Sequence, residues 1–357
     1  MTWIGDELRR IADDMPERDL AGRALETHHR RRRNLVAAVA AAVVVITVLT
    51  GTVAIRLLPG RVPDAARPPA PPERATVNVA MVSSGEAAPL FVAQEKGFFA
   101  AEGLTVQPVF IPSSAAAVPG LLEGQYALAQ TDHLTAFVAH EHGRDVRIAG
   151  GLHRAEPRSL ALAVEAGSQI RTVAGLKGKL IAVPELNGLA MLSLNAVLKR
   201  AGLAITQVKL VEKPYPEMLP GLRTGKFAAA VLAEPFVSMG QGHTRVLREM
   251  MTGEFAGLPT AGWMVEESWA RANPRTMAAF LRALAKAHRV IADDPKAASA
   301  IIPSYLRTTT RETERAALGT YSAELDIPAL QRLADVARRY GFLKKPLDVR
   351  SVIVPPR

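Results

Sequence analysis

The nonapeptide Pro119–Ala127, PGLLEGQYA, returns later in the chain as Pro220–Ala228, PGLRTGKFA. Each copy follows an apolar, strand-like run and a Gly-Leu pair that ends a helix, at Gly103-Leu104 and at Gly202-Leu203. After each copy, small apolar residues lead into a polar cluster. The chain therefore uses one structural unit twice, which predicts two similar α/β lobes. A cleft between two lobes is a usual place for a small ligand.

The residues around the first copy alternate between strand and helix patterns. A strand at 77–82 leads through a small-residue loop to a helix at 89–101. A second strand at 106–111, a short helix ending at Gly124 and a strand at 126–130 follow. Strand, turn and helix in this order indicate βαβ units. A connection at 159–164 then leads out of this lobe.

The second copy lies in a segment with the same order of strands and helices. Strands are expected at 180–184, 208–212 and 228–233, with a helix at 189–200; a return strand is expected at 261–265. The second lobe, 166–257, is thus inserted into a first lobe made of 76–165 and completed by 258–357. The two crossing strands form a hinge that permits closure over a ligand.

The part of the chain after 265 has a helical pattern. Pro274 follows a capping asparagine, and Thr309–Glu312 matches a capping box. Residue Asp326 starts a last helix that stops at Gly341.

The N-terminal part has the composition of a membrane anchor. Leu35–Ile55 is an uncharged, mostly apolar run of 21 residues, and at about 1.5 Å each these reach across a bilayer core of roughly 30 Å. We expect a cytoplasmic basic tail at 1–34, a transmembrane anchor at 35–58 and a proline-rich linker at 59–75. Arg30–Arg33 place the N-terminus in the cytoplasm and the main domain outside. A cleaved signal peptide is the alternative, although 34 residues before the apolar run is long for one.

Composition excludes several classes of function. The chain of 357 residues has no cysteine, so disulfides, thiolate metal sites and cysteine nucleophiles are ruled out. Its net charge is +10, but residues 1–75 hold 12 basic and 9 acidic side chains, which leaves only about +7 over the rest. No dense basic stripe with aromatics occurs outside Arg30–Arg33, so no nucleic-acid partner is expected. His140 and His142 are spaced i,i+2, which does not place them on one helix face, and we expect no metal site.

Residues 89–104, PLFVAQEKGFFAAEGL, closely resemble the start of a family of extracytoplasmic substrate-binding proteins. The family is the SsuA-like class of ABC-transporter proteins for nitrate, sulfonate, taurine and thiamine pyrimidines. Gly124, Leu176–Lys179 and Glu234-Pro235 agree in order, and the resemblance covers about residues 76–300.

The resemblance implies a type 2 periplasmic-binding fold, a monomer, no cofactor, and delivery of a ligand from the interlobe cleft to an ABC permease and its ATPase. The sequence departs from the family pattern at Ala127, Ala233 and Asn187-Gly188. A roomier pocket, less suited to a small oxyanion, follows from these departures.

Loops at the carboxyl ends of strands are the expected ligand sites in open α/β folds. Nine residues there are candidate ligand contacts: Ser83, Ser84, Ser113, Ser114, Thr131, Asp132, Asn187, Gly188 and Glu234. For the serines and for Asp132 the alternative is helix capping. For Glu234 it is a structural hydrogen bond across the hinge. Tyr215 and Trp263 are aromatic candidates for stacking on a ring, with packing in the core as the alternative.

Three functions remain open at this point. The leading hypothesis is a solute receptor for import, with a nitrogen-bearing organic ligand favoured by the Glu234 carboxylate and with no chemistry. The second is an enzyme on the same fold, a pyrimidine synthase or a lyase, with Asp132 and His133 in acid–base roles. The third is a sensor that signals through the membrane helix.

Overall fold

The computed structural model describes residues 70–355, and the residues from Ala70 on form one compact unit. The predicted tail, the anchor at 35–58 and the linker up to residue 69 lie outside the described residues. Within 70–355, no helix has the length and apolar character needed to cross a bilayer. Residues 70–75, assigned to the linker by composition, pack on the folded unit: the Glu73 carboxylate accepts hydrogen bonds from the N–H groups of Arg275 and Thr276.

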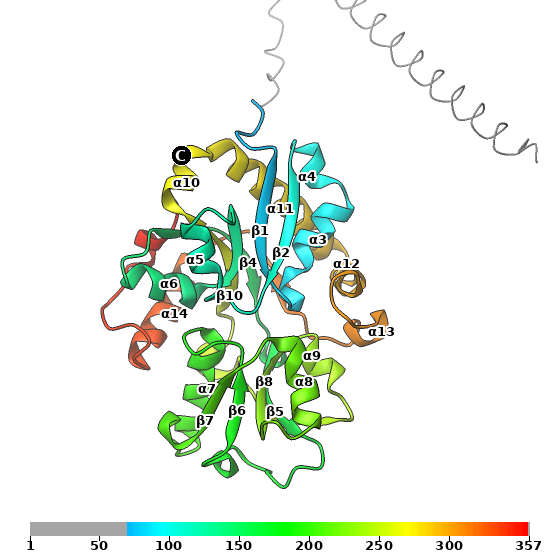
Figure 1. Cartoon of the computed structure of the whole chain (residues 1–357), viewed down its shortest axis with the longest axis vertical. Coiled ribbons are helices and arrows are strands. Elements are labelled where there is room, and N and C mark those ends of the chain that lie inside the picture. Colours follow the sequence, from blue (N-terminus) through cyan, green and yellow to red (C-terminus); the bar gives the residue numbers. More distant parts are fainter. Residues whose placement is uncertain (1–69, 356–357) are drawn as a thin grey trace, which may run out of the picture. The chain divides into compact units, whose positions relative to one another are not determined.

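The first of two sheets contains both parallel and antiparallel strands (Figure 1). Its strand order is β11-β4-β10-β3-β1-β2, with β1 parallel to β2 and β3, and with β10 antiparallel to β3 and β4. The bounds are β1 Thr76–Val82, β2 Thr105–Ile111, β3 Leu128–Asp132, β4 Val146–Arg154, β10 Pro259–Glu266 and β11 Thr320–Tyr321.

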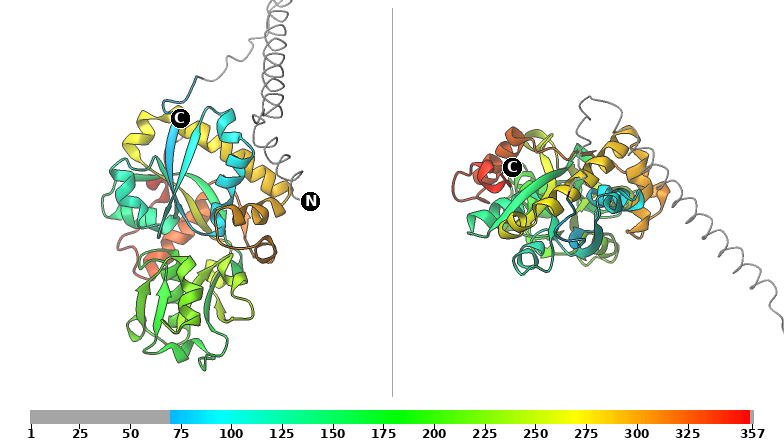
Figure 2. Two further views of the ribbon diagram at one scale, coloured as in Figure 1. Left: turned by 45° about the vertical axis from the view of Figure 1, so that its right-hand side comes forward. Right: turned by 90° about the horizontal axis from the view of Figure 1, so that it is seen from above.

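The second sheet lies at the other end of the long axis, drawn in green in Figures 1 and 2. Its order is β7-β6-β8-β5-β9, in which β6 is parallel to β7 and β8 while β5 is antiparallel to both neighbours. The bounds are β5 Leu160–Glu165, β6 Leu180–Val183, β7 Lys209–Glu212, β8 Ala229–Ala233 and β9 Thr244–Glu249. The predicted two-sheet α/β architecture is confirmed.

The longer helices pack against the sheets, and short ones fill the connections. With the first sheet are α3 Ala88–Glu95, α4 Phe98–Ala101, α5 Ala117–Leu122, α6 His133–Glu141, α10 Glu267–Ala272, α11 Pro274–Asp293, α12 Lys296–Ile301 and α14 Ile327–Arg339. With the second are α7 Leu189–Arg200, α8 Tyr215–Arg223 and α9 Phe236–Met239, and α13 Thr310–Thr313 packs on α9 and α12.

The repeated nonapeptide has a packing reason in both lobes. Gly120 of α5 lies against the ring of Tyr126, and Gly221 of α8 lies against the ring of Phe227, so closely that a Cβ at either glycine would overlap the ring. Gly124 and Gly225 then end the two helices at φ of +71° and +69°, a left-handed conformation that glycine adopts without strain. The shared letters therefore encode one helix, turn and strand unit.

Several sequence expectations need correction. The single helix at 89–101 is two helices, because Gly97 adopts φ +70° between α3 and α4. The connection at 159–164 contains the strand β5, which pairs in the second sheet. On this pairing we place the first crossing between the lobes before β5; the lobe bounds of the sequence analysis otherwise stay a prediction.

Trp263 is part of the core. Its side chain is fully buried, and its ring meets Phe280 edge-on at 4.9 Å. Trp263 therefore packs in the core, which was the alternative to stacking on a ligand ring.

Candidate functional site

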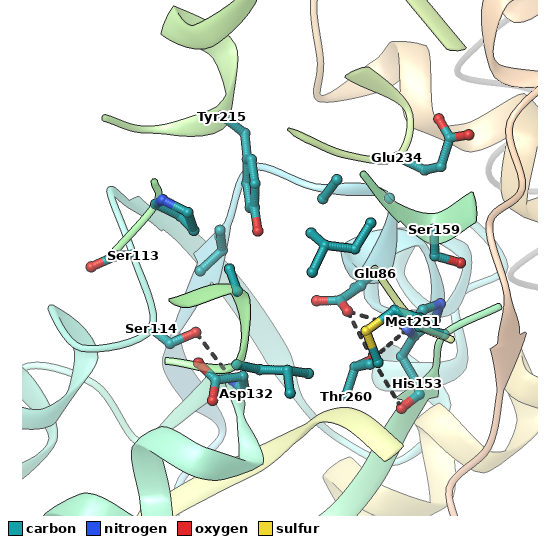
Figure 3. A pocket seen from close by; sticks show the side chains of 18 of the residues that line it. Glu86, Ser113, Ser114, Asp132, His153, Ser159, Tyr215, Glu234, Met251 and Thr260 are labelled. Carbon is teal, nitrogen blue, oxygen red and sulfur yellow. Dashed lines mark hydrogen bonds and ion pairs between the residues drawn. The ribbon is translucent and has the colours of Figure 1, made fainter. Parts of the chain in front are cut away.

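A cavity lies between the two sheets, with walls from both (Figure 3). Its volume is about 70 Å³, which is room for several waters or a small organic molecule. The polar lining residues are Glu86, Ser113, Ser114, Asp132, His153, Ser159, Glu185, Tyr215, Glu234 and Thr260. The apolar lining includes Leu160, Leu189, Met251 and Leu318. A partly open space of this kind can take up a ligand between the two sheets.

One wall holds a carboxylate paired with an imidazole. His153 of β4 has its Nδ1 3.1 Å from Glu86 Oε1 and 2.7 Å from the Thr260 hydroxyl, while its Nε2 contacts the Leu318 carbonyl oxygen. Both ring nitrogens thus face oxygen atoms that can accept a hydrogen bond. Burial alone would raise the pKa of Glu86, but hydrogen bonds and the interaction with His153 outweigh it and lower the pKa.

Asp132 ends β3 and caps α6. Its Oδ1 accepts from the Thr135 N–H at 2.9 Å and its Oδ2 from the Thr135 hydroxyl at 2.8 Å. The Asp132 N–H donates to the Ser114 hydroxyl at 3.0 Å. The capped-helix alternative for Asp132 is therefore present, and Asp132 and Ser114 nevertheless line the cavity.

Glu185 follows β6 in the second lobe and reaches across to the first. Only 5% of its surface is exposed, and its Oε2 accepts from the Ala115 N–H at 2.8 Å. Its Oε1 and the Oδ2 of Asp132 converge beside Gly188. Burial, and after it the charge of Asp132, raises the pKa of Glu185 well above its ordinary value. Sequence reasoning missed this residue, although it stands two positions before the candidate Asn187.

The hydroxyl of Tyr215 points into the cavity (Figure 3). Its ring stacks on Phe236 at 6.2 Å with an interplanar angle of 16°, which fixes the position of the hydroxyl. Burial, followed by the charges of Glu86, Glu185 and Asp132, raises the pKa of Tyr215 well above its usual range. Tyr215 is therefore a neutral hydrogen-bonding group inside the cavity.

Glu234 lines the cavity, but its carboxylate points away from it (Figure 3). Oε2 accepts from the Ser238 N–H at 3.0 Å, and Oε1 accepts from the Ser238 hydroxyl at 2.9 Å and from the Ala317 N–H at 3.1 Å. Burial raises the pKa of Glu234 in spite of these donors. The carboxylate thus makes the structural hydrogen bonds that were the alternative to ligand binding.

The other candidates are divided between the cavity and its surroundings. Ser113 lines the cavity, whereas Ser83, Ser84, Thr131 and Asn187 do not. Ser84 and Thr131 are buried, and Asn187 is exposed. Gly188 lies at the meeting point of Asp132 and Glu185.

His133 packs behind the sheet, where its ring carbon Cε1 lies against Gly262, and it does not line the cavity with Asp132. Burial lowers the pKa of His133 to about 4. Within residues 70–355, no group of three or more His, Cys, Asp or Glu side chains could hold a metal ion.

The sequence and the fold were compared with known proteins. The family model described as NMT1/THI5 like matches residues 84–298. No curated protein matches the sequence.

Three of the similar solved structures are binding proteins. The alkanesulfonate-binding protein SsuA from Xanthomonas axonopodis pv. citri, bound to MOPS, has a TM-score of 0.67 at 19% identity over 79% of this chain and 99% of its own. The aliphatic sulphonate-binding SsuA from Escherichia coli scores 0.62 at 17% identity over 79% and 98%. The nitrate-binding NrtA from Synechocystis PCC 6803 scores 0.66 at 15% identity over 79% and 86%. At these identities the likeness establishes a fold of the periplasmic-binding-protein kind.

Proposed function

The chain belongs to the NMT1/THI5-like family, and from that membership we propose that it is an extracytoplasmic solute-binding protein that captures a small organic molecule for an ABC importer. The observation that carries the proposal is the partly open cavity with walls from both sheets. Capture of this kind needs only that two lobes close on a solute and open again. A permease and its ATPase would be the partners.

We further propose that Leu35–Ile55 anchors the protein in the cytoplasmic membrane, with the N-terminus inside and the cavity outside. The support is the length of this apolar run and the block Arg30–Arg33 before it. The anchor would keep the receptor near its permease.

The cavity favours a ligand with amino or other N–H groups over a sulfonate or nitrate. Its lining residues include four acids, Glu86, Asp132, Glu185 and Glu234, and no lysine or arginine. The imidazole of His153 is already paired with Glu86. An oxyanion would lie near acidic oxygens without a counter-charge, which is costly in a buried site. Amino groups could instead donate to Asp132 and to the Tyr215 and Ser113 hydroxyls.

The enzyme alternative has less support from the site. Its acid–base pair would be Asp132 and His133, but the His133 ring is buried behind Gly262. Asp132 itself is occupied as a helix cap. Simple binding requires neither group to move a proton.

A binding screen on the full chain in detergent tests the proposal. We expect a saturable rise in melting temperature and a calorimetric binding signal with an aminopyrimidine or a small amine, and none with nitrate or ethanesulfonate, because a ligand of the folded state stabilises it. Tyr215→Phe should weaken the affinity for the bound compound about three- to tenfold through the loss of one hydrogen bond. Tyr340→Phe, at a surface tyrosine bonded to Glu254, is the matched control. Binding of oxyanions alone would refute the ligand class.

A further inference from the structure

Two acidic side chains from opposite lobes meet beside the cavity. We propose that Asp132 and Glu185 share one proton across the cleft, and that this proton holds the two lobes together in the ligand-free protein. The inference rests on the proposed function, because it concerns the regulation of the same cavity. Its test needs no ligand, so it can fail or succeed independently of the solute-receptor proposal.

The contacts of Glu185 make it a bridge between the lobes. Its backbone belongs to the loop after β6 in the second lobe, while its Oε2 accepts from Ala115 N–H in the first lobe at 2.8 Å. A Cβ at Gly188 would overlap Glu185 Oε1 and would lie 2.8 Å from Asp132 Oδ2. The two carboxyl groups therefore converge on one point, where a hydrogen bond between them can form.

Two carboxyl groups can form that hydrogen bond only when one of them carries a proton. Both oxygens of Asp132 already accept hydrogen bonds from Thr135, so Glu185 is the carboxyl group better placed to donate. If both groups were ionised, they would repel each other in a buried place. Closure and protonation are thus linked by geometry.

The surroundings of Glu185 add negative rather than positive charge. Glu212 of β7 also faces it and raises its pKa further, while the Ala115 N–H acts in the opposite direction. Tyr215 of α8 and Glu86 of the first lobe complete the titratable groups around the pair, and His153 is paired with Glu86. Among the residues that line the cavity, no lysine or arginine offsets these acids.

The direction of the pH effect follows from the raised pKa of Glu185. In an open protein its pKa would return towards the ordinary value, so the open state gives up the proton more readily than the closed state. Closure is therefore most favoured at low pH. It weakens as the pH rises between the open-state and the closed-state pKa. Each unit of difference between these two values changes the closed-to-open ratio about tenfold.

A distance measurement in the full chain tests whether the shared proton holds the two lobes together. The protein has no cysteine, so Gln94→Cys on α3 and Thr206→Cys in the second lobe, both exposed, would carry the only two spin labels. In the ligand-free protein with detergent, we expect one short interlabel distance at pH 5 and a longer one that grows at least tenfold in population by pH 9. Glu185→Gln should stay at the short distance at both values, because its amide donates to Asp132 and its oxygen still accepts from Ala115 without titrating.

Matched variants separate the effect of the shared proton from a general effect of pH. Glu217→Gln removes an exposed carboxyl group of α8 that does not act on Glu185 and should keep the wild-type response. Asp132→Asn preserves a good helix cap and should abolish the response, which provides a second variant if Glu185→Gln folds poorly. A wild-type distance that does not change between pH 5 and pH 9 would overturn the proposal, as would an undiminished opening of both Glu185→Gln and Asp132→Asn.

Discussion

His288 is a buried imidazole on α11 with 6% of its surface exposed. Neither ring nitrogen has a hydrogen-bond partner among the described residues. Burial lowers its pKa from 6.5 to about 4. Because the unfolded chain binds this proton more readily, titration of His288 has no effect on stability above pH 6.5 and lowers stability as the pH falls from 6.5 towards 4.

Replacing this imidazole should therefore stabilise the fold. His288→Leu removes two unpaired polar atoms from the interior and should raise the free energy of unfolding by about 1 kcal/mol at neutral pH. The gain should be larger at pH 5, because the variant has no proton to take up there on unfolding. Urea unfolding at pH 7.5 and pH 5 measures both effects. A variant less stable than the wild type at pH 5 would contradict this account.

At the residue scale, local position in the sequence identified part of the cavity lining. Ser113, Ser114, Asp132 and Glu234 were predicted because they follow strands of the repeat, and all four line the cavity. His153 and Thr260 were not found, because they lie on strands far apart in sequence and meet only through sheet pairing. Glu185 was missed because nothing local marks a carboxyl group whose partner is in the other lobe.

At the element scale, the start of α7 depends on a glycine. Gly188 is the N-cap residue, and the place of its missing Cβ is already occupied by the Glu185 carboxyl group. Its φ of −108° is accessible to any residue, so a substitution acts through crowding and not through backbone strain.

Gly188→Ala should force the Glu185 and Asp132 carboxyl groups apart. We expect the interlabel distance at pH 5 to resemble that of the wild type at pH 9, because the shared proton loses its site. Gly175→Ala in the same lobe is the control, since its added Cβ would meet a methyl group of Ile170 at 3.3 Å. A closed Gly188→Ala protein at pH 5 would show that the crowding is relieved elsewhere.

The helix Leu189–Arg200 was predicted to the residue, and the expected strands differ from the observed bounds by one or two residues. Strand β4 was missed, since Gly150 and Gly151 break its apolar pattern. Gly151 is required there because a Cβ would overlap the Glu324 carbonyl oxygen. The glycine that obscured the strand pattern therefore allows a close approach of two backbone segments.

At the scale of the whole molecule, residues 317–321 form a third segment that contacts both lobes, beside the two crossings near 155–159 and 250–258. Towards the second lobe, the Ala317 carbonyl oxygen accepts from the Ser159 hydroxyl, and the Ala317 N–H donates to Glu234. Towards the first lobe, Leu318 contacts His153, and the Tyr321 hydroxyl donates to the Gly85 carbonyl oxygen at 2.7 Å. Any opening of the cavity must accommodate this segment.

Glu234→Gln should lower the free energy of unfolding of the whole folded unit. An amide has one acceptor oxygen where the carboxylate has two, so at least one of the N–H groups of Ser238 and Ala317 would face an NH₂ group. We expect a loss of about 1–3 kcal/mol in the free energy of unfolding, measured in urea. Glu314→Gln, at an exposed carboxyl group nearby, should be close to neutral. Unchanged stability of Glu234→Gln would contradict the structural role.

Under the proposed proton link, closed lobes would also slow the entry of a solute into the cavity. The association rate would then be the encounter rate multiplied by the fraction of time spent open. For a receptor open about 1% of the time, both association and apparent affinity fall about a hundredfold. The pH around the protein would then set the rate of capture, which would be slower in acid and faster in alkali.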